Sequence, residues 1–372
     1  LAEQTGSLLV FLPGIAEINR TLKYINTNEH INANKYINAK EHILPHEQKA
    51  PNKTPHDLIQ YQTLHGNLAL KDQQAAIAPA QKGYRKVVLA TDIAETSLTI
   101  EGVRVVIDAG LCRSPSFDPN SGLTRLHTYN HSQAAAEQRA GRAGRMEPGV
   151  CYRLWSEAAH NQRAQHATPE ILTADLTPLC LTLLSWGCNN PQELKWLNMP
   201  PKANWQQALN TLSQLGAIDE KQHLNATGKR LTQFACHPRI ALMLINAEHY
   251  GAPKLGAMLA AILSERLPQN FSTDLAVIYR AASGLDAISQ SHKHWQQRVQ
   301  QLARQFMQAL NPKPIQTLYD EEELIGLLLA HAFAERIAKR KSSDSQNAVF
   351  QLANGRAVHL AIGENLAHAQ WL

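Results

Sequence analysis

The stretch KVVLATDIAETSLTIEGVRVVIDAG, residues 86–110, holds two apolar runs on either side of a polar segment. Both runs are almost continuous in Val, Leu and Ile. Strands of this composition are typical of a parallel sheet that is covered by helices on both faces. The stretch therefore predicts two buried strands joined through a polar segment.

Further apolar runs extend this pattern through the first 160 residues. They are SLLVFLP (7–13), GVCYRLW (149–155) and a weaker candidate, DLIQYQTLHG (57–66). A helical pattern from Ile15 to Ile25 lies between two of them, and this alternation favours an open α/β sheet. Residues 26–56 break the pattern with tandem hexapeptides that suit neither helix nor strand. We interpret them as an inserted surface loop, or in part as an extension of the preceding helix.

After residue 160 the strand runs nearly vanish. TADLTPLCLTLLSWG (173–187) predicts an apolar helix that ends at a glycine, and a second helix is expected from Trp205 to Leu215. A short hairpin is expected at 217–225. Helices followed by a small hairpin suggest a winged-helix module over residues 161–232.

Residues 233–340 are expected to form a helical bundle. An amphipathic stripe runs from Ile288 to Ala309, and a last long helix is expected from EEE (321–323) to KRK (339–341), where the charges match the helix dipole. Residues 341–372 would begin a further region with a hairpin around Asn354-Gly355.

Composition sets limits on the class of protein. The 372 residues carry a net charge of +5, which permits an anionic partner without requiring one. The five cysteines form no CxxC pair and no zinc spacing, so we expect free thiols in a reducing compartment, the cytoplasm, and no metal site. No apolar run reaches membrane-spanning length and no signal peptide is visible. Because the chain starts at Leu1 close to a strand, we expect a piece of a longer protein.

A second polar segment, SQAAAEQRAGRAGR (132–145), precedes the last strand of the first region. Ligands collect beyond the carboxyl ends of the strands in an open parallel sheet. If the whole segment is a helix, Gln138, Arg142 and Arg145 share one stripe, and Arg139 lies about 100° away. Guanidinium groups offer paired donors that suit phosphate oxygens.

Gly141 and Gly144 each cost a helix about 1 kcal/mol relative to alanine. We expect this cost to be tolerated because a polyanion and a facing domain approach the backbone there. A basic helix that contacts RNA and a solvated arginine-rich face are the alternatives.

The segment TDIAETS offers short polar side chains where a strand ends. Thr91 and Asp92 suit a ribose hydroxyl, a phosphate-bound water or a backbone turn. Thr96 and Ser97 are donors able to contact a nucleic-acid phosphate, although capping is the usual reason for such residues.

These motifs resemble those of the DEAH/RHA helicases of superfamily 2. The similar stretches are motif IV (8–18), motif V (90–110) and motif VI (138–145). Three others look most like the bacterial HrpB branch: 116–126, 169–187 and 352–360. The resemblance implies an ATP-driven RNA helicase that moves 3′ to 5′. It implies a second RecA-like domain in residues 1–160, then a winged helix and a ratchet-like bundle.

The resemblance also implies roles for single residues. Gln138, Arg142 and Arg145 would reach the ATP phosphates, with the arginines as fingers worth on the order of 10³ to 10⁵ in rate. Thr91 and Asp92 would lie near the nucleotide, although the family usually has asparagine at the second position.

Ile77 occupies the place where relatives often put an aromatic against adenine. Thr96 would contact the RNA backbone. Residues 112–128 would form a β-hairpin along the RNA path, where Arg113 and Arg125 contact phosphate or stay solvated.

The 372 residues contain no G-x-x-x-x-G-K-[ST] loop and no DExH box. The resemblance places both, with most Mg²⁺ ligands, in a first RecA-like domain before Leu1. We therefore expect this chain alone, a monomer without membrane contact, to be inactive, while the parent protein uses ATP, Mg²⁺ and RNA. The alternative is a non-catalytic RNA-binding scaffold that retains half of a helicase.

Overall fold

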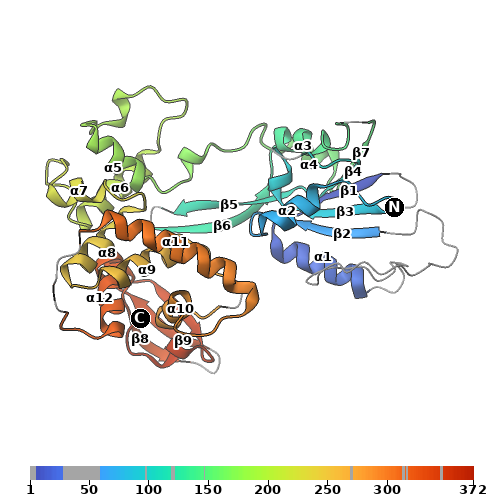
Figure 1. Cartoon of the computed structure of the whole chain (residues 1–372). Coiled ribbons are helices and arrows are strands. Elements are labelled where there is room, and N and C mark those ends of the chain that lie inside the picture. Colours follow the sequence, from blue (N-terminus) through green and yellow to red (C-terminus); the bar gives the residue numbers. More distant parts are fainter. Residues whose placement is uncertain are drawn as a thin grey trace. The chain divides into compact units, whose positions relative to one another are not determined.

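The computed structural model describes residues 6–27, 59–96, 99–118, 122–145, 147–268, 271–311, 315, 317–343 and 347–372. The expected insert therefore lies outside the described residues, apart from its first two positions, and so does Ser97. The chain divides into two compact units, Leu1–Ala174 and Asp175–Leu372 (Figure 1). The finer division at residues 160, 232 and 340 stays a prediction.

All five apolar runs of the N-terminal unit are strands of one parallel sheet, as the sequence predicts. The strands are β1 (Ser7–Phe11), β2 (Ile59–Leu64), β3 (Arg85–Ala90), β4 (Val103–Asp108) and β7 (Val150–Arg153). Their order is β2-β3-β1-β4-β7, and each neighbouring pair is parallel. The sheet has the RecA-like α/β arrangement.

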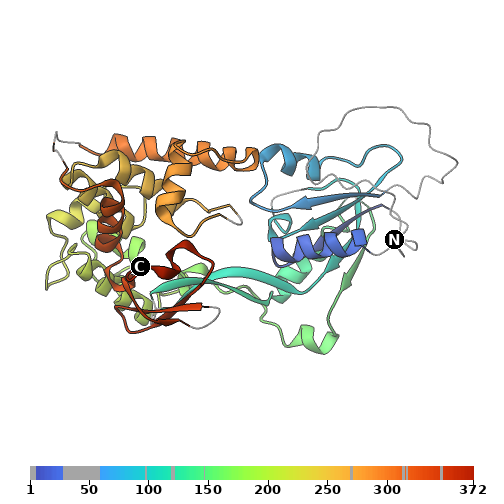
Figure 2. The ribbon, with the colours of Figure 1, turned by 90° about the horizontal axis from the view of Figure 1, so that it is seen from below.

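Helices and turns cover both faces of this sheet, which explains the uninterrupted apolar strands. Helix α1 (Ile15–Thr27) lies along one face and packs Ile18 against Leu8 and Val87 (Figure 2). The other face receives α2 (Leu70–Ile77) and the turn after β3.

The connection from β4 to β7 carries the other elements of this unit. They are the antiparallel strands β5 (Leu111–Asp118) and β6 (Leu123–Asn130) and helix α3 (Gln133–Ala140), and α4 (Glu157–Asn161) follows β7. The expected hairpin over 112–128 is therefore present, one residue longer at its start and two at its end.

The C-terminal unit is mainly helical. Its α-helices are α5 (Thr177–Ser185), α6 (Lys202–Gln214), α7 (Ala226–Leu231), α8 (Pro238–His249), α9 (Pro253–Ser264), α10 (Leu275–Ser283), α11 (Lys293–Ala309) and α12 (Glu321–Ala332). The glycine expected after the first of them is Gly187, with φ of +83°. Ile218 and Leu224 form an antiparallel bridge where the short hairpin is expected.

The prediction of one long helix over 321–341 is wrong. Helix α12 starts at a capping box and ends at Ala332, and the basic run lies in β8 (Ala338–Ser343). Strand β8 pairs with β9 (Asn347–Leu352), which pairs with β10 (Ala357–Ala361) around the predicted Asn354-Gly355 turn. Ala338 is buried in one cluster with Phe350, and this packing favours a strand at these residues. The lysines on either side of Arg340 are exposed.

Two helical glycines offer a test of packing in the C-terminal unit. A Cβ at Gly256 of α9 would lie 2.2 Å from the Cβ of Ala247 in α8, whereas a Cβ at Gly326 of α12 would meet nothing within 4 Å. We expect Gly256→Ala to lower the free energy of unfolding by about 1–3 kcal/mol because the two helices must separate. Gly326→Ala should raise it by about 0.5–1 kcal/mol. Chemical denaturation followed by circular dichroism measures both, and a Gly256→Ala protein at least as stable as wild type would contradict this packing.

Candidate functional site

The polar segment after β3 forms a tight turn at the carboxyl end of the sheet. Asp92–Ala94 is a single 3₁₀ turn that follows Thr91, and the Glu95 amide donates to the Asp92 carbonyl at 2.8 Å. The Thr91 amide donates to the carbonyl of Leu64 at 3.1 Å, which ties the turn to the next strand. Thr91 and Asp92 thus lie where the sequence predicts, and the Asp92 side chain is exposed.

Helix α3 begins as expected and ends early. The Ser132 hydroxyl accepts a hydrogen bond from the amide of Ala135 at 3.2 Å, as a helix cap does. The helix ends at Ala140, and residues 141–144 form successive turns, so a helix reaching residue 145 is wrong. The first glycine ends the helix, because glycine favours the helical state less than alanine does. Arg142 and Arg145 therefore do not share a helical wheel with Gln138.

The two arginines nevertheless reach one segment. Nη2 of Arg142 donates to the carbonyl oxygens of Glu95 and, at 2.7 Å, Thr96. Nη1 of Arg145 donates to Oγ1 of Thr99 at 2.6 Å. The structure thus brings Arg142 together with Thr96, the residue predicted to contact RNA, and places Arg145 against Thr99 of the same segment.

The three predicted phosphate-contacting side chains differ in exposure. Gln138 and Arg145 are exposed, Arg142 is half-buried, and Gln138 makes no side-chain hydrogen bond to the residues that the structure describes. Burial and the nearby charge of Arg145 lower the pKa of Arg142, and Glu95 opposes this. A guanidinium remains charged at neutral pH even so.

Sequence reasoning missed the buried centre of this region, which is Arg139. Its side chain is 1% exposed, with Nη1 3.0 Å from Oδ1 of Asp108 and Nε 3.0 Å from Oε2 of Glu95. Nη1 also donates to the Leu111 carbonyl at 3.2 Å, and the guanidinium lies 4.8 Å from the centre of the Phe11 ring. The signal was available, because a position off the exposed stripe of a helix packed on a sheet faces inward.

Asp108, at the end of β4, has further partners. Nε2 of His131 lies 3.0 Å from Oδ2 of Asp108, and Nδ1 of the same ring lies 3.0 Å from the carbonyl oxygen of Ser132. Burial raises the pKa of Asp108, but the hydrogen bond from His131 and the charge of Arg139 outweigh burial and leave this pKa below its ordinary value. The carboxylate therefore stays ionised inside the unit.

Ile77, expected against adenine, is the last residue of α2 and packs partly buried on the core beneath the turn. The carbonyls on either side of Ile77 both accept hydrogen bonds from Nζ of buried Lys86. They belong to Ala76, at 2.7 Å, and to Ala78. Burial lowers the pKa of Lys86 to about 8, and Glu101 opposes this. Lys86 thus fixes the backbone that presents Ile77.

The two hairpin arginines differ in their surroundings. Arg113 donates from Nε to Thr128 at 3.1 Å and lies 3.4 Å from Oε1 of Glu17. Arg125 lies on β6, opposite Ser116, and is exposed. Arg125 is therefore the more accessible of the two for an anion.

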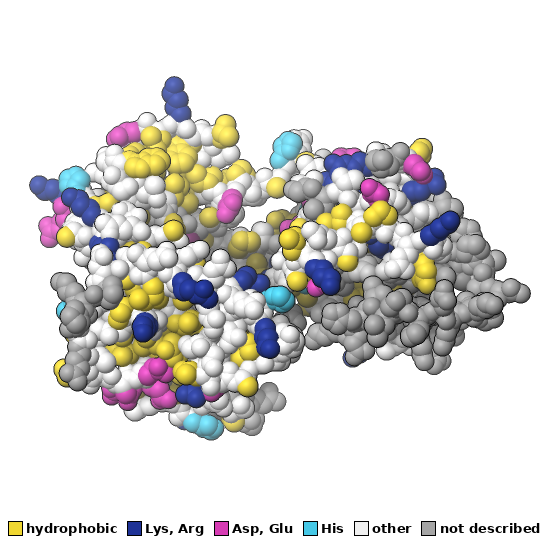
Figure 3. All heavy atoms as spheres, viewed as in Figure 1, with side chains coloured by type: hydrophobic (Ala, Val, Ile, Leu, Met, Phe, Trp, Pro, Cys, Tyr) yellow, Lys and Arg dark blue, Asp and Glu magenta, His cyan; other side chains and the backbone are white. Residues whose placement is uncertain are grey.

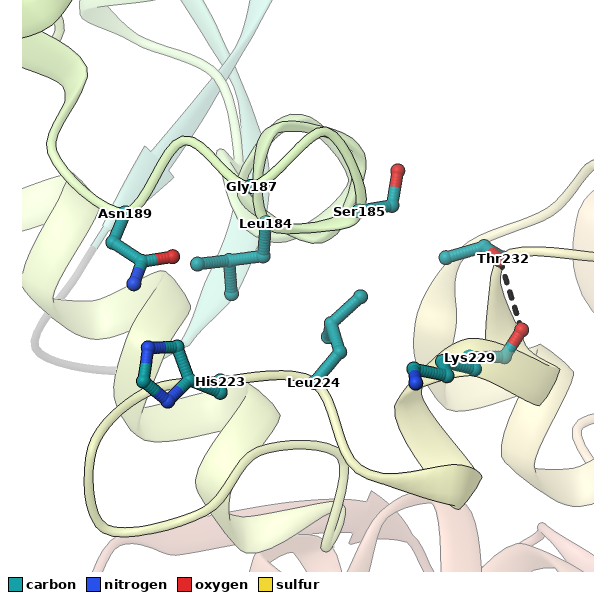
Figure 4. Close-up of a pocket in the computed structure, with 8 residues that line it drawn as sticks. All are labelled: Leu184, Ser185, Gly187, Asn189, His223, Leu224, Lys229 and Thr232. Carbon is teal, nitrogen blue, oxygen red and sulfur yellow. Dashed lines mark hydrogen bonds between the residues drawn. The ribbon is translucent and has the colours of Figure 1, made fainter.

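Other surface features add no second site. An open pocket in the C-terminal unit is lined by residues that are not among the predicted site residues: Leu184, Ser185, Gly187, Asn189, His223, Leu224, Lys229 and Thr232 (Figure 4). Lys and Arg side chains are spread singly over the coloured surface in Figure 3. In the described part of the chain, no three His, Cys, Asp or Glu side chains are grouped to hold a metal ion. None of the described helices is long and apolar enough to span a bilayer.

The donors of Arg142 and Arg145 suit the phosphates of a nucleotide. Both now donate to oxygen atoms of the 95–99 segment, and phosphate oxygens are acceptors of the same kind with added charge.

Comparison with known proteins gives a consistent result. Residues 1–147 match the family model of the helicase conserved C-terminal domain. The chain is 39% identical, over all 372 residues, to the ATP-dependent RNA helicase HrpB of Escherichia coli. It is 35% identical over 266 residues, 72% of its length, to the probable ATP-dependent RNA helicase DHX34 of Mus musculus. The crystal structure of the Escherichia coli DEAH/RHA helicase HrpB superposes on the whole chain with a TM-score of 0.81 and 37% identity.

This chain is related to the DEAH/RHA helicases of the HrpB branch. The predicted resemblance to the DEAH/RHA helicases is thus confirmed, and the assignment of motifs IV, V and VI stays a prediction. The chain spans 40% of the length of HrpB, 41% of the chain in its crystal structure and 21% of DHX34.

The buried ion pairs of Arg139 predict a strong effect on stability. Arg139→Met would leave the buried carboxylate of Asp108 without its guanidinium partner, with His131 as its remaining side-chain contact, so we expect the N-terminal unit to lose about 3–5 kcal/mol. Arg153→Met is the matched control, because Arg153 pairs at 2.7 Å with Glu137 at the surface, where such pairs are worth about 0–1 kcal/mol. Urea denaturation measures both variants, and equal losses would contradict the central place of Arg139.

Proposed function

We propose that this chain supplies the arginine side of an ATP site, and an RNA contact beside it, to an ATP-driven RNA helicase. Gln138, Arg142 and Arg145 hold the phosphates, and Thr91, Asp92 and Ile77 lie on the sugar and base side. The contact of Arg142 and Arg145 with the 95–99 segment carries the proposal. The family relationship supports it, since HrpB is named as an ATP-dependent RNA helicase.

Bound ATP with Mg²⁺ supplies the phosphoryl group that is transferred. The part of this chain is electrostatic, because guanidinium groups of Arg142 and Arg145 stabilise negative charge on that group. The 372 residues contain no phosphate loop and no DExH box, so we propose that they do not turn over ATP alone.

RNA contact is proposed for Thr96 and Ser97 at the turn and for Arg125 and Arg113 on the hairpin. We further propose that α5 to α7 form a winged helix and that α8 to α12 form a ratchet-like bundle along the RNA. Movement from 3′ to 5′ and action as a monomer complete the proposal.

Arg142→Ala in the intact natural protein tests this function. We expect RNA-stimulated ATP turnover to fall by about 10³-fold or more, because a finger charge is lost, while RNA binding persists. Arg20→Ala, which removes a surface ion pair with Glu17 at 2.9 Å in the N-terminal unit, should keep wild-type turnover. Phosphate release with and without RNA is the measurement.

Unchanged turnover in Arg142→Ala would refute the proposed function. A natural protein that binds RNA but shows no ATP turnover would favour the scaffold alternative.

A further inference from the structure

We propose that the ion pair between Glu95 and Arg139 is a positioning link that couples the RNA contact at Thr96 to the phosphate-facing arginines. The inference rests on the proposed function and assigns roles to two residues that contact neither ligand in it. Neither Glu95 nor Arg139 belongs to the stripe of Gln138, Arg142 and Arg145 that the sequence predicts.

Glu95 accepts hydrogen bonds at two places, its carboxylate and its carbonyl oxygen, from arginines at the end of α3 and in the turn that follows it. Its carboxylate accepts a hydrogen bond from Nε of Arg139 at 3.0 Å, and its carbonyl oxygen accepts one from Nη2 of Arg142. Thr96 is the next residue, and its carbonyl accepts from the same Nη2 at 2.7 Å. A shift of the backbone at Thr96 therefore changes the acceptors of Arg142 directly.

The other end of the link is rigid. Arg139 is fixed by Asp108 at 3.0 Å and by the carbonyl of Leu111 at 3.2 Å, and Asp108 is held by His131. Asp108 and His131 are 0% and 2% exposed. Arg139 cannot move with Glu95, because this anchor is packed into the unit. A displacement of Glu95 therefore changes the position of the neighbouring residues of the turn.

Glu95 is the better residue to change. Arg139 keeps its pairing with Asp108 when Glu95 is made neutral, so Glu95→Gln removes the ion pair without orphaning a buried charge. Glu95 is 17% exposed, which allows the new amide to reach water. Glu137→Gln is the matched control. Glu137 lies on the same helix as Arg139, and the substitution breaks only its surface ion pair with Arg153 of β7.

The experiment measures ATP turnover of the intact natural protein across a titration with single-stranded RNA. We expect Glu95→Gln to lower the stimulation factor, the ratio of turnover with saturating RNA to turnover without it, by about tenfold. Glu137→Gln should keep the wild-type factor. Glu95→Asp retains the charge and should recover part of the loss, which a merely structural role would not predict.

A wild-type stimulation factor in Glu95→Gln, with Arg142→Ala inactive, overturns the link and leaves the proposed function standing. If the wild-type protein shows no stimulation, the proposed function itself fails. Should Glu95→Gln not fold, Arg139→Lys takes its place, since a lysine keeps the charge beside Asp108 but cannot bridge both carboxylates. A wild-type factor in that variant overturns the link equally.

Discussion

One guanidinium, almost entirely removed from water, lies between two carboxylates at the carboxyl edge of the sheet. Burying a charge is costly unless it is paired and hydrogen-bonded, and Arg139 meets that requirement with Asp108, Glu95 and the Leu111 carbonyl. These partners come from β4, from the turn after β3 and from the start of β5. The ion pairs therefore fix the relative places of the elements that carry the candidate site.

The arrangement of the exposed arginines follows from this anchor. Helix α3 ends one residue after Arg139, and the turns that follow bring Arg142 and Arg145 over the 95–99 segment. The helical wheel places Arg139 off the exposed stripe without identifying it as buried, and it is incorrect beyond Ala140. Arg142 and Arg145 both donate to the segment that follows the turn after β3. A helical wheel that continues through Gly141 and Gly144 cannot reveal this shared partner.

The sequence predicts most strongly where burial leaves a pattern. Strands covered on both faces bury side chains on both sides, so the middle parts of β1, β3 and β4 are visible as apolar runs. The basic run 339–341 misleads because exposed lysines suit a helix end and the open face of a strand equally well. Pairing with β9 decides between them, and no local pattern encodes that pairing. Likewise, the roles of Glu95, Asp108 and His131 depend on contacts between segments distant in the chain.

The contacts of Arg142 indicate why a separate link is needed under the proposed function. Carbonyl oxygens of Glu95 and Thr96 are neutral acceptors, and a charged phosphate oxygen adds the attraction of opposite charges to the hydrogen bond. Arg142 would therefore leave the turn when it holds a phosphate. The carboxylate of Glu95 stays with Arg139, whose partners are buried and have no competing ligand. The turn thus keeps one attachment to α3 in both situations, and only the second attachment depends on the nucleotide.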